Sequence, residues 1–226
     1  TVNKTQYAWK TSCDLPMATY RFGSDGKMLD GIVEIDGSLY YYEKGNPKQA
    51  GLVEFDGSLC FVYGTNGEVC VNEARHVWKT NGLLPESTYE FGPDGKILNG
   101  LVKKDTGLYY YETGKPKMAG LIKIDGYYYF AYGTNGEVCV GEERYVWKTS
   151  CDLPEDTYEF GADGRMLDGI VEKDGILYYY ETGKPKQAGL IEIDGGYYFA
   201  NGANGELTVN ENRYVYVYTP EKNGEL

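Results

Sequence analysis

Apolar positions in this chain fall in short β-prone runs that are interrupted by turn signals. In Gly31–Tyr42, two such runs flank Asp36-Gly37, and in Gly51–Tyr63 two runs flank Asp56-Gly57. Asp-Gly between β-prone runs favours a tight hairpin turn, because both central residues must adopt positive φ. No ten-residue window free of Gly and Pro has the i, i+3, i+4, i+7 spacing of an amphipathic helix. The pattern therefore predicts an all-β chain of hairpins.

The same pattern returns every 69 residues, three times over, as the spacing of Trp9, Trp78 and Trp147 shows. Each period holds about three hairpin-like units. Isolated hairpins are marginal in water, so successive hairpins are expected to stack on one another. We expect a single elongated β-hairpin repeat solenoid over residues 1–226. Its repeats would span about 7–75, 76–144 and 145–213, with a partial unit or linker at 214–226.

The chain has 24 tyrosines and a formal net charge of −12. An acidic surface repels nucleic acid, and no basic cluster with interleaved aromatic residues is present. No stretch approaches the roughly 18 apolar residues that a membrane span needs. We therefore expect neither a nucleic-acid partner nor a membrane span, whereas neutral sugars and cationic groups are compatible with the charge. The start at Thr1 rather than Met suggests a piece of a longer protein.

The five cysteines occupy positions that the repeats do not share consistently. Cys13 and Cys151 are repeat equivalents, but the middle repeat has Gly82 at that place. Only Cys139 and Cys151 are close enough in sequence for a local bridge, and the other repeats lack that pair. A disulfide framework would keep its partners together, so we expect free or semi-buried thiols. A metal site is the alternative, although no Cys-x-x-Cys motif occurs.

Catalytic residues are not indicated. The only histidine, His76, stands where the other repeats have Tyr7, Tyr145 and Tyr214, so the position requires an aromatic ring rather than an imidazole. A glycosidase-type carboxylate pair stays open among 34 acidic residues, but most of these lie in turns or at repeated strand positions. We expect a protein that is not an enzyme.

Acidic residues that lie close together, such as Asp25, Asp30 and Asp36, raise calcium as an alternative to the expectation of no cofactor. The spacing of an EF-hand is missing. Asp-Gly turns account for most of these residues without a metal ion.

The recurring aromatic residues are the best candidates for binding. Neighbours on a strand point to opposite faces, so some rings in each tyrosine run must face the core and others must face outward. Trp78 and His76 lie on the same strand face, and equivalent pairs recur in the other repeats. Such a pair is a candidate outward platform on which sugar rings or ammonium groups could stack. The alternative is that the tryptophan is buried and anchors the hairpin in the core. The candidate ligand-binding residues are Trp9, Trp78, Trp147, Tyr7, Tyr145, Tyr41, Tyr110, Tyr179, Tyr128 and Tyr198.

The segment Gly120–Phe130, followed by Gly133 and Gly136, resembles the cell-wall-binding repeats of Gram-positive surface proteins. This group includes choline-binding modules, glucan-binding repeats of glucosyltransferases and receptor-binding repeats of large clostridial toxins. The resemblance covers about 40 of every 69 residues. It implies a β-hairpin solenoid that is secreted or displayed at the cell surface and holds a polysaccharide or cell-wall polymer.

The chain departs from the choline-binding pattern, in which tryptophan follows the first glycine of a hairpin. Aliphatic residues stand there instead: Ile32, Leu52, Leu101, Leu121, Ile170 and Leu190. Because a cage of that kind would lack most of its tryptophans, the sequence favours a glycan over choline. The alternative is a structural or adhesive spacer that binds a host or partner protein.

Overall fold

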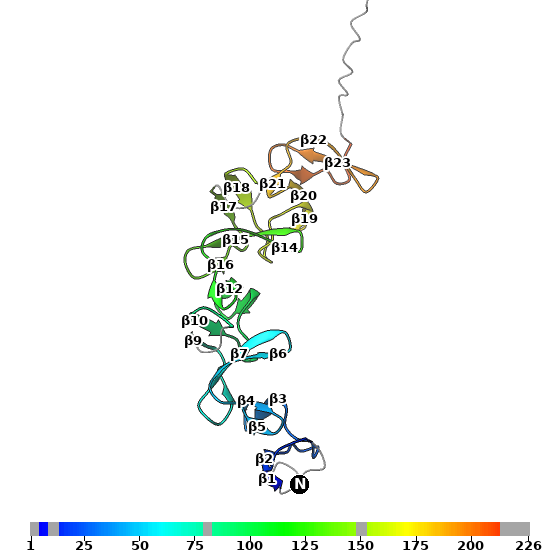
Figure 1. The fold of residues 1–226 in the computed structure, drawn as a ribbon. Helices are drawn as coiled ribbons and strands as arrows, with labels where there is room; N and C mark the ends of the chain where they lie inside the picture. Colours follow the sequence, from blue (N-terminus) through cyan, green and yellow to red (C-terminus); the bar gives the residue numbers. More distant parts are fainter. Residues whose placement is uncertain (1–4, 9–13, 79–82, 148–152, 213–226) are drawn as a thin grey trace, which may run out of the picture. The chain divides into compact units, whose positions relative to one another are not determined.

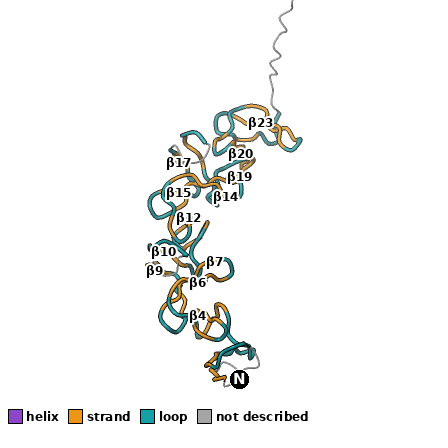
Figure 2. Tube along the Cα trace, viewed as in Figure 1, coloured by secondary structure: helices purple, strands orange, loops and turns teal. Residues whose placement is uncertain are grey.

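The computed structural model describes residues 5–8, 14–78, 83–147 and 153–212. All the regular secondary structure within these ranges consists of β-strands (Figure 1 and Figure 2). The described residues contain no helix that is long and apolar enough to cross a membrane. Each repeat contributes a two-stranded hairpin and a six-stranded sheet built from further hairpins. The predicted all-β fold of repeated hairpins is confirmed.

The chain divides into two compact units. The first unit comprises Thr1–Asp105 and Tyr109–Lys117, and the second comprises Thr106–Leu108 and Met118–Leu226. The boundary runs through the strand β12 (Gly107–Glu112).

The strands of the first unit lie in the first repeat and in part of the second. They are β1 (Thr5–Ala8), β2 (Ala18–Arg21), β3 (Gly31–Ile35), β4 (Ser38–Glu43), β5 (Asn46–Pro47), β6 (Gly51–Phe55), β7 (Ser58–Tyr63), β8 (Glu68–Val69), β9 (Glu73–Val77), β10 (Ser87–Phe91), β11 (Gly100–Lys104) and β13 (Lys115–Pro116).

The strands of the second unit complete the second repeat and form the third. They are β14 (Gly120–Ile124), β15 (Tyr127–Tyr132), β16 (Glu137–Val138), β17 (Glu143–Val146), β18 (Asp156–Glu159), β19 (Gly169–Lys173), β20 (Ile176–Glu181), β21 (Lys184–Pro185), β22 (Gly189–Ile193), β23 (Gly196–Asn201) and β24 (Glu206–Leu207).

The turn chemistry explains the register of the hairpins. In the hairpin β3–β4, Asp36 and Gly37 have φ values of 52° and 81°, which is the positive pair that a type I′ turn requires. The turn places Ile35 opposite Ser38 and Gly31 opposite Tyr42. The sheet of the first repeat has the strand order β3-β4-β8-β7-β6, and the third repeat has the same order, β19-β20-β24-β23-β22.

Two of the core clusters form where a two-stranded hairpin packs on the sheet that precedes it. In the first unit, Val77, Tyr89 and Phe91 of the hairpin β9–β10 are buried together with Leu52 and Cys70. The second unit repeats this arrangement with Val146, Tyr158, Phe160, Leu121 and Cys139. An isolated hairpin cannot bury its apolar face, and this packing supplies the cover it lacks.

Each buried tyrosine of these hairpins also closes its own loop. The hydroxyl of Tyr89 donates a hydrogen bond of 2.8 Å to the carbonyl oxygen of Pro85. Tyr20 makes the same bond to Pro16, and Tyr158 makes it to Pro154. The ring is therefore buried without leaving its hydroxyl group unsatisfied.

Gly67→Ala is expected to destabilise the fold more than the matched variant Gly37→Ala. Both glycines have φ near +80°, where a side chain costs about 1–2 kcal/mol. A Cβ atom on Gly67 would lie 2.7 Å from the carbonyl oxygen of Tyr41, whereas a Cβ atom on Gly37 meets nothing within 4 Å. Urea unfolding should show an additional loss of about 1–3 kcal/mol for Gly67→Ala. Equal losses in the two variants would contradict this account.

Candidate functional site

The two tryptophans that the structure describes lie on the outer face of their hairpins. Val77 and Val146 are buried in the core, so the residues on either side of each valine point away from it. Trp78 is 63% exposed and Trp147 is 69% exposed. Neither indole is therefore a buried pin of its hairpin. Trp9 lies outside the described residues.

Each exposed tryptophan is held by the aromatic ring two residues earlier. The ring centroids of His76 and Trp78 are 4.3 Å apart with planes at 72°, and those of Tyr145 and Trp147 are 4.9 Å apart at 74°. These are edge-to-face contacts, which favour one orientation of the indole over others. The same geometry forms in both units although the first ring differs. We call each pair an aromatic corner.

Polar groups border the aromatic corners. Thr88 lies opposite His76 on the neighbouring strand, and Thr157 lies opposite Tyr145, with both threonines exposed. The Oε1 atom of Glu86 is 3.5 Å from Nε2 of His76. An exposed indole face beside hydroxyl and carboxylate groups offers a ligand both a stacking surface and hydrogen-bond partners.

The tyrosines that the sequence analysis added to the site differ in exposure. Tyr7 is exposed on β1 opposite Thr19. Tyr41 is only 9% exposed and packs in the core, with its ring centroid 5.8 Å from that of Phe55. Its position supports packing rather than contact with a ligand. The other members stand on β12, β15, β20 and β23: Tyr110, Tyr128 and Tyr179 are partly buried, and Tyr198 is 36% exposed.

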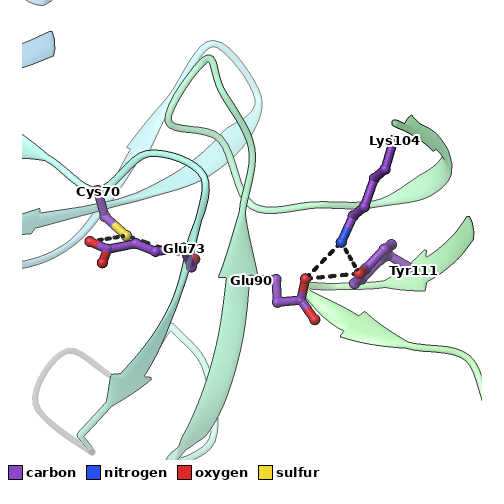
Figure 3. A network of polar contacts seen from close by, with 5 residues as sticks. All are labelled: Cys70, Glu73, Glu90, Lys104 and Tyr111. Carbon is purple, nitrogen blue, oxygen red and sulfur yellow. Dashed lines mark hydrogen bonds and ion pairs between the residues drawn. The ribbon is translucent and has the colours of Figure 1, made fainter. Parts of the chain in front are cut away.

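A polar network that the sequence analysis missed lies in the second repeat (Figure 3). The Nζ atom of Lys104 is 3.0 Å from Oε2 of Glu90 and 2.5 Å from the hydroxyl oxygen of Tyr111. The hydroxyl of Tyr111 donates to the same carboxylate oxygen at 2.8 Å. We call these three residues a Lys–Glu–Tyr triad, and it recurs in the third repeat as Lys173, Glu159 and Tyr180.

The triad shifts the ionisation of its own members. Burial raises the pKa of the Tyr111 hydroxyl, which therefore stays protonated at neutral pH. Burial lowers the pKa of the Lys104 ammonium, but its hydrogen bonds to Tyr111 and Glu90 outweigh this effect and the pKa is raised overall. Lys104 is thus held as a cation. A signal for the triad was present in the sequence, because Glu90 and Lys104 recur together one period later.

Clefts lie between a two-stranded hairpin and the edge strand of the sheet that follows it. In the second repeat, Glu90 and Lys104 line a cleft of about 460 Å³ between the hairpin β9–β10 and β11. The first repeat has an equivalent cleft of about 580 Å³, which Arg21 and Ile35 line at the same positions. Each cleft is wide enough for a small ligand beside the triad position.

The repeated acidic residues act as turn caps. The Oδ1 atom of Asp25 accepts the backbone N–H of Lys27 at 2.9 Å, and Asp94 and Asp163 make the same contact in the other repeats. A second position, Asp30, accepts the N–H of Lys44, and its equivalent in the middle repeat is Asn99. An amide replaces a carboxylate there without loss of the contact, which indicates hydrogen bonding rather than a metal ligand. Among the described residues, no group of three or more side chains could hold a metal ion.

The cysteines that the structure describes are free thiols. Cys60, Cys70 and Cys139 form no disulfide, as their irregular occurrence predicts, and all three are fully buried, whereas Cys13 and Cys151 lie outside the described residues. Burial raises the pKa of Cys60 and Cys139 to about 11 and that of Cys70 to about 12. Cys70 also has its Sγ atom 3.4 Å from Oε1 of Glu73, which disfavours the thiolate further (Figure 3). Such thiols are poor nucleophiles and poor metal ligands at neutral pH.

Alkylation with iodoacetamide at pH 9 is expected to be slow at Cys60, Cys70 and Cys139 in the folded protein. An ordinary thiol with a pKa of 9.0 is half ionised at this pH, whereas a pKa near 11 leaves ~1% as thiolate. Labelling followed by peptide mass spectrometry should therefore show these three sites protected natively and modified rapidly in denaturant. Rapid labelling of Cys60 in the folded protein would show that its thiol is accessible and that its pKa is not raised.

No protein-family model matches the chain. Glucosyltransferase-S of Streptococcus mutans is 26% identical over 191 residues, which are 84% of this chain and 12% of that protein. The chain therefore spans about an eighth of the length of this relative. The resemblance to cell-wall-binding hairpin repeats, indicated by Gly120–Phe130, is confirmed.

Two solved structures to which the chain is similar are proteins of Streptococcus pneumoniae. Choline binding protein F is 21% identical, with 90% of this chain and 74% of that chain covered and a TM-score of 0.39. CbpJ is 18% identical, with 94% of this chain and 91% of that chain covered and a TM-score of 0.42.

Proposed function

We propose that the chain is a non-catalytic extracellular module that binds a neutral polysaccharide or cell-wall glycan through several repeats. The observation that carries this proposal is the recurrence of one exposed tryptophan, Trp78 or Trp147, held edge-on by the preceding aromatic ring in each unit. A relative named as a glucosyltransferase and structural neighbours named as choline-binding proteins are consistent with such a module at a bacterial surface.

The chemistry of the aromatic corner suits a sugar. A pyranose ring presents an apolar face of C–H groups and an equatorial rim of hydroxyl groups. The exposed indole would take the face, and groups such as Thr88 and Glu86 would exchange hydrogen bonds with the rim. The net charge of −12 disfavours a polyanionic polymer, so an uncharged glycan fits the surface better.

Multivalency compensates for the small size of each corner. One tryptophan and a few hydroxyl groups form a shallow site of low affinity. When two such sites are joined in one chain, the second binding event becomes intramolecular and gains effective concentration. Avidity of this kind can exceed the single-site affinity by about 10²–10⁴ without a new contact.

The variant Trp78→Ala/Trp147→Ala should lose retention on an insoluble neutral glucan column by about tenfold or more, and by more than either single variant. Both indoles are more than 60% exposed, so the variants should unfold at nearly the wild-type urea concentration. The matched control is Tyr197→Ala, which removes an aromatic ring that is 68% exposed but lies outside the corners.

Unchanged retention of the folded double variant would contradict the proposal. Binding of a host or partner protein by a structural spacer would then become the better interpretation. A retention loss in Tyr197→Ala equal to that of the double variant would also contradict it, since the effect would then not belong to the corners.

A further inference from the structure

The ammonium groups of Lys104 and Lys173 are surrounded by tyrosine rings and a carboxylate, which are groups that could also bind a free organic cation. The Nζ atom of Lys104 lies 4.7 Å from the ring centroid of Tyr111 and 5.3 Å from that of Tyr109, beside the carboxylate of Glu90. In the third repeat, Nζ of Lys173 lies 4.6 Å from the centroid of Tyr180. Aromatic faces within about 6 Å attract an ammonium group, and a neighbouring carboxylate adds an opposite charge.

We infer that Lys104 and Lys173 are specificity-determining residues that fill these two sites as tethered ammonium ligands and thereby exclude free organic cations. This inference refines the proposed function, since it names a ligand class that the chain rejects. A tethered group competes at an effective concentration that short linkages raise to millimolar or above. A free ammonium compound must therefore displace the lysine before it can reach the tyrosine rings.

The first repeat offers an internal comparison, because other residue types replace both partners of the ion pair. Ile35 stands in place of Lys104, and Arg21 stands in place of Glu90. The Nη1 atom of Arg21 donates to the hydroxyl of Tyr42 at 2.9 Å, and its guanidinium carbon lies 5.9 Å from that ring centroid. The ion pair is lost, yet a cation from the chain remains at the tyrosine. Occupation of the ring by a tethered cation is therefore what the three repeats have in common.

Other tyrosine faces carry cations from the chain in the same way. The pairs are Arg75 over Tyr63, Lys115 over Tyr89, Lys123 over Tyr128, Arg165 over Tyr127, Arg144 over Tyr132 and Lys184 over Tyr158. Their distances of 4.0–5.3 Å to the ring centroids match those of the triads. Each of these six tyrosine rings is thus covered by a cation of the chain, as the rings of the triads are.

The structure also shows where a free cation would fit if the lysine were removed. Lys104 and Glu90 line the cleft of about 460 Å³ beside β11. Shortening Lys104 to alanine would extend this cleft to the rings of Tyr109 and Tyr111 and leave Glu90 without its counter-ion. A small alkylammonium ion could then take the position of Nζ.

The test uses the full chain with Lys104→Ala, Lys173→Ala and the double variant, titrated with methylammonium and tetramethylammonium chloride. Tyrosine ring resonances observed by NMR should show saturable binding in the millimolar range for the variants and none for the wild type. The matched control, Lys117→Ala/Lys186→Ala, removes two lysines that pair with Glu112 and Glu181 elsewhere, and it should gain no binding. Sodium chloride at equal ionic strength corrects for screening.

Glu90→Gln in the Lys104→Ala background should weaken the acquired binding about tenfold, because the carboxylate supplies the counter-charge. If removal of a lysine destabilises the fold, methylammonium should raise the melting temperature of that variant above its value in sodium chloride, and should leave the control unchanged. Folded variants that bind no better than the wild type would overturn the inference, and so would a wild type that already binds with the affinity of the variants.

This experiment is separable from the test of the proposed function. The Lys104→Ala/Lys173→Ala variant keeps both aromatic corners, so its retention on a neutral glucan should equal that of the wild type. The two experiments therefore report on different sites. Substitution of Trp78 and Trp147 tests retention on the glucan, and substitution of the lysines tests binding of ammonium ions.

Discussion

The packing of each two-stranded hairpin on the preceding sheet is the interaction on which the remaining features depend. A hairpin such as β9–β10 has one apolar face, and burial of a large side chain such as Phe91 contributes about 1.5–3 kcal/mol. The hairpin is thus held by its neighbour rather than by its own turn. Because strand residues alternate, burial of Val77 forces His76 and Trp78 to the opposite side. The aromatic corner follows from the same packing that stabilises the repeat.

The abundance of tyrosine reflects construction more than recognition. A tyrosine ring buries a large apolar area, and its hydroxyl can meet a polar group at the edge of the core. Tyr89 does this with the carbonyl oxygen of Pro85, and Tyr111 does it with Glu90. Lysine and arginine side chains cover further ring faces. The number of aromatic residues is therefore a poor guide to the number of rings that are free to meet a ligand.

Under the proposed function, the shallow aromatic corners and the tyrosine rings covered by lysine side chains together favour a long, uncharged ligand. Under the proposed function a polymer would contact more than one corner, whereas a small cation would meet rings such as Tyr111 and Tyr180 that lysines of the chain already cover. Each contact can be weak because the repeats act together. The acidic surface adds a long-range preference against polyanions, and this preference is screened at physiological ionic strength beyond about 8 Å. Short-range stacking must then supply the selectivity.

Local chemistry made the strands, the turns and the 69-residue period predictable from the sequence alone. Asp36-Gly37 favours a hairpin turn between two β-prone runs, because both residues accept positive φ, and both adopt it here. Alternation along a strand likewise predicts that His76 and Trp78 share a face. It does not say which face is buried, since that depends on what packs against the hairpin. Only the tertiary structure decided that Tyr41 is core and Trp78 is exposed.

The Lys–Glu–Tyr triad likewise required the three-dimensional structure. Its members are separated by up to 21 residues and come from a hairpin and from two strands of the following sheet. Glu90 and Lys104 recur together one period later, which is compatible with a contact between them. The recurrence does not identify this contact, because most other positions of the repeat recur as well. The fold brings these side chains within hydrogen-bond distance because the hairpin packs against the edge of the sheet, and no local pattern encodes that distance.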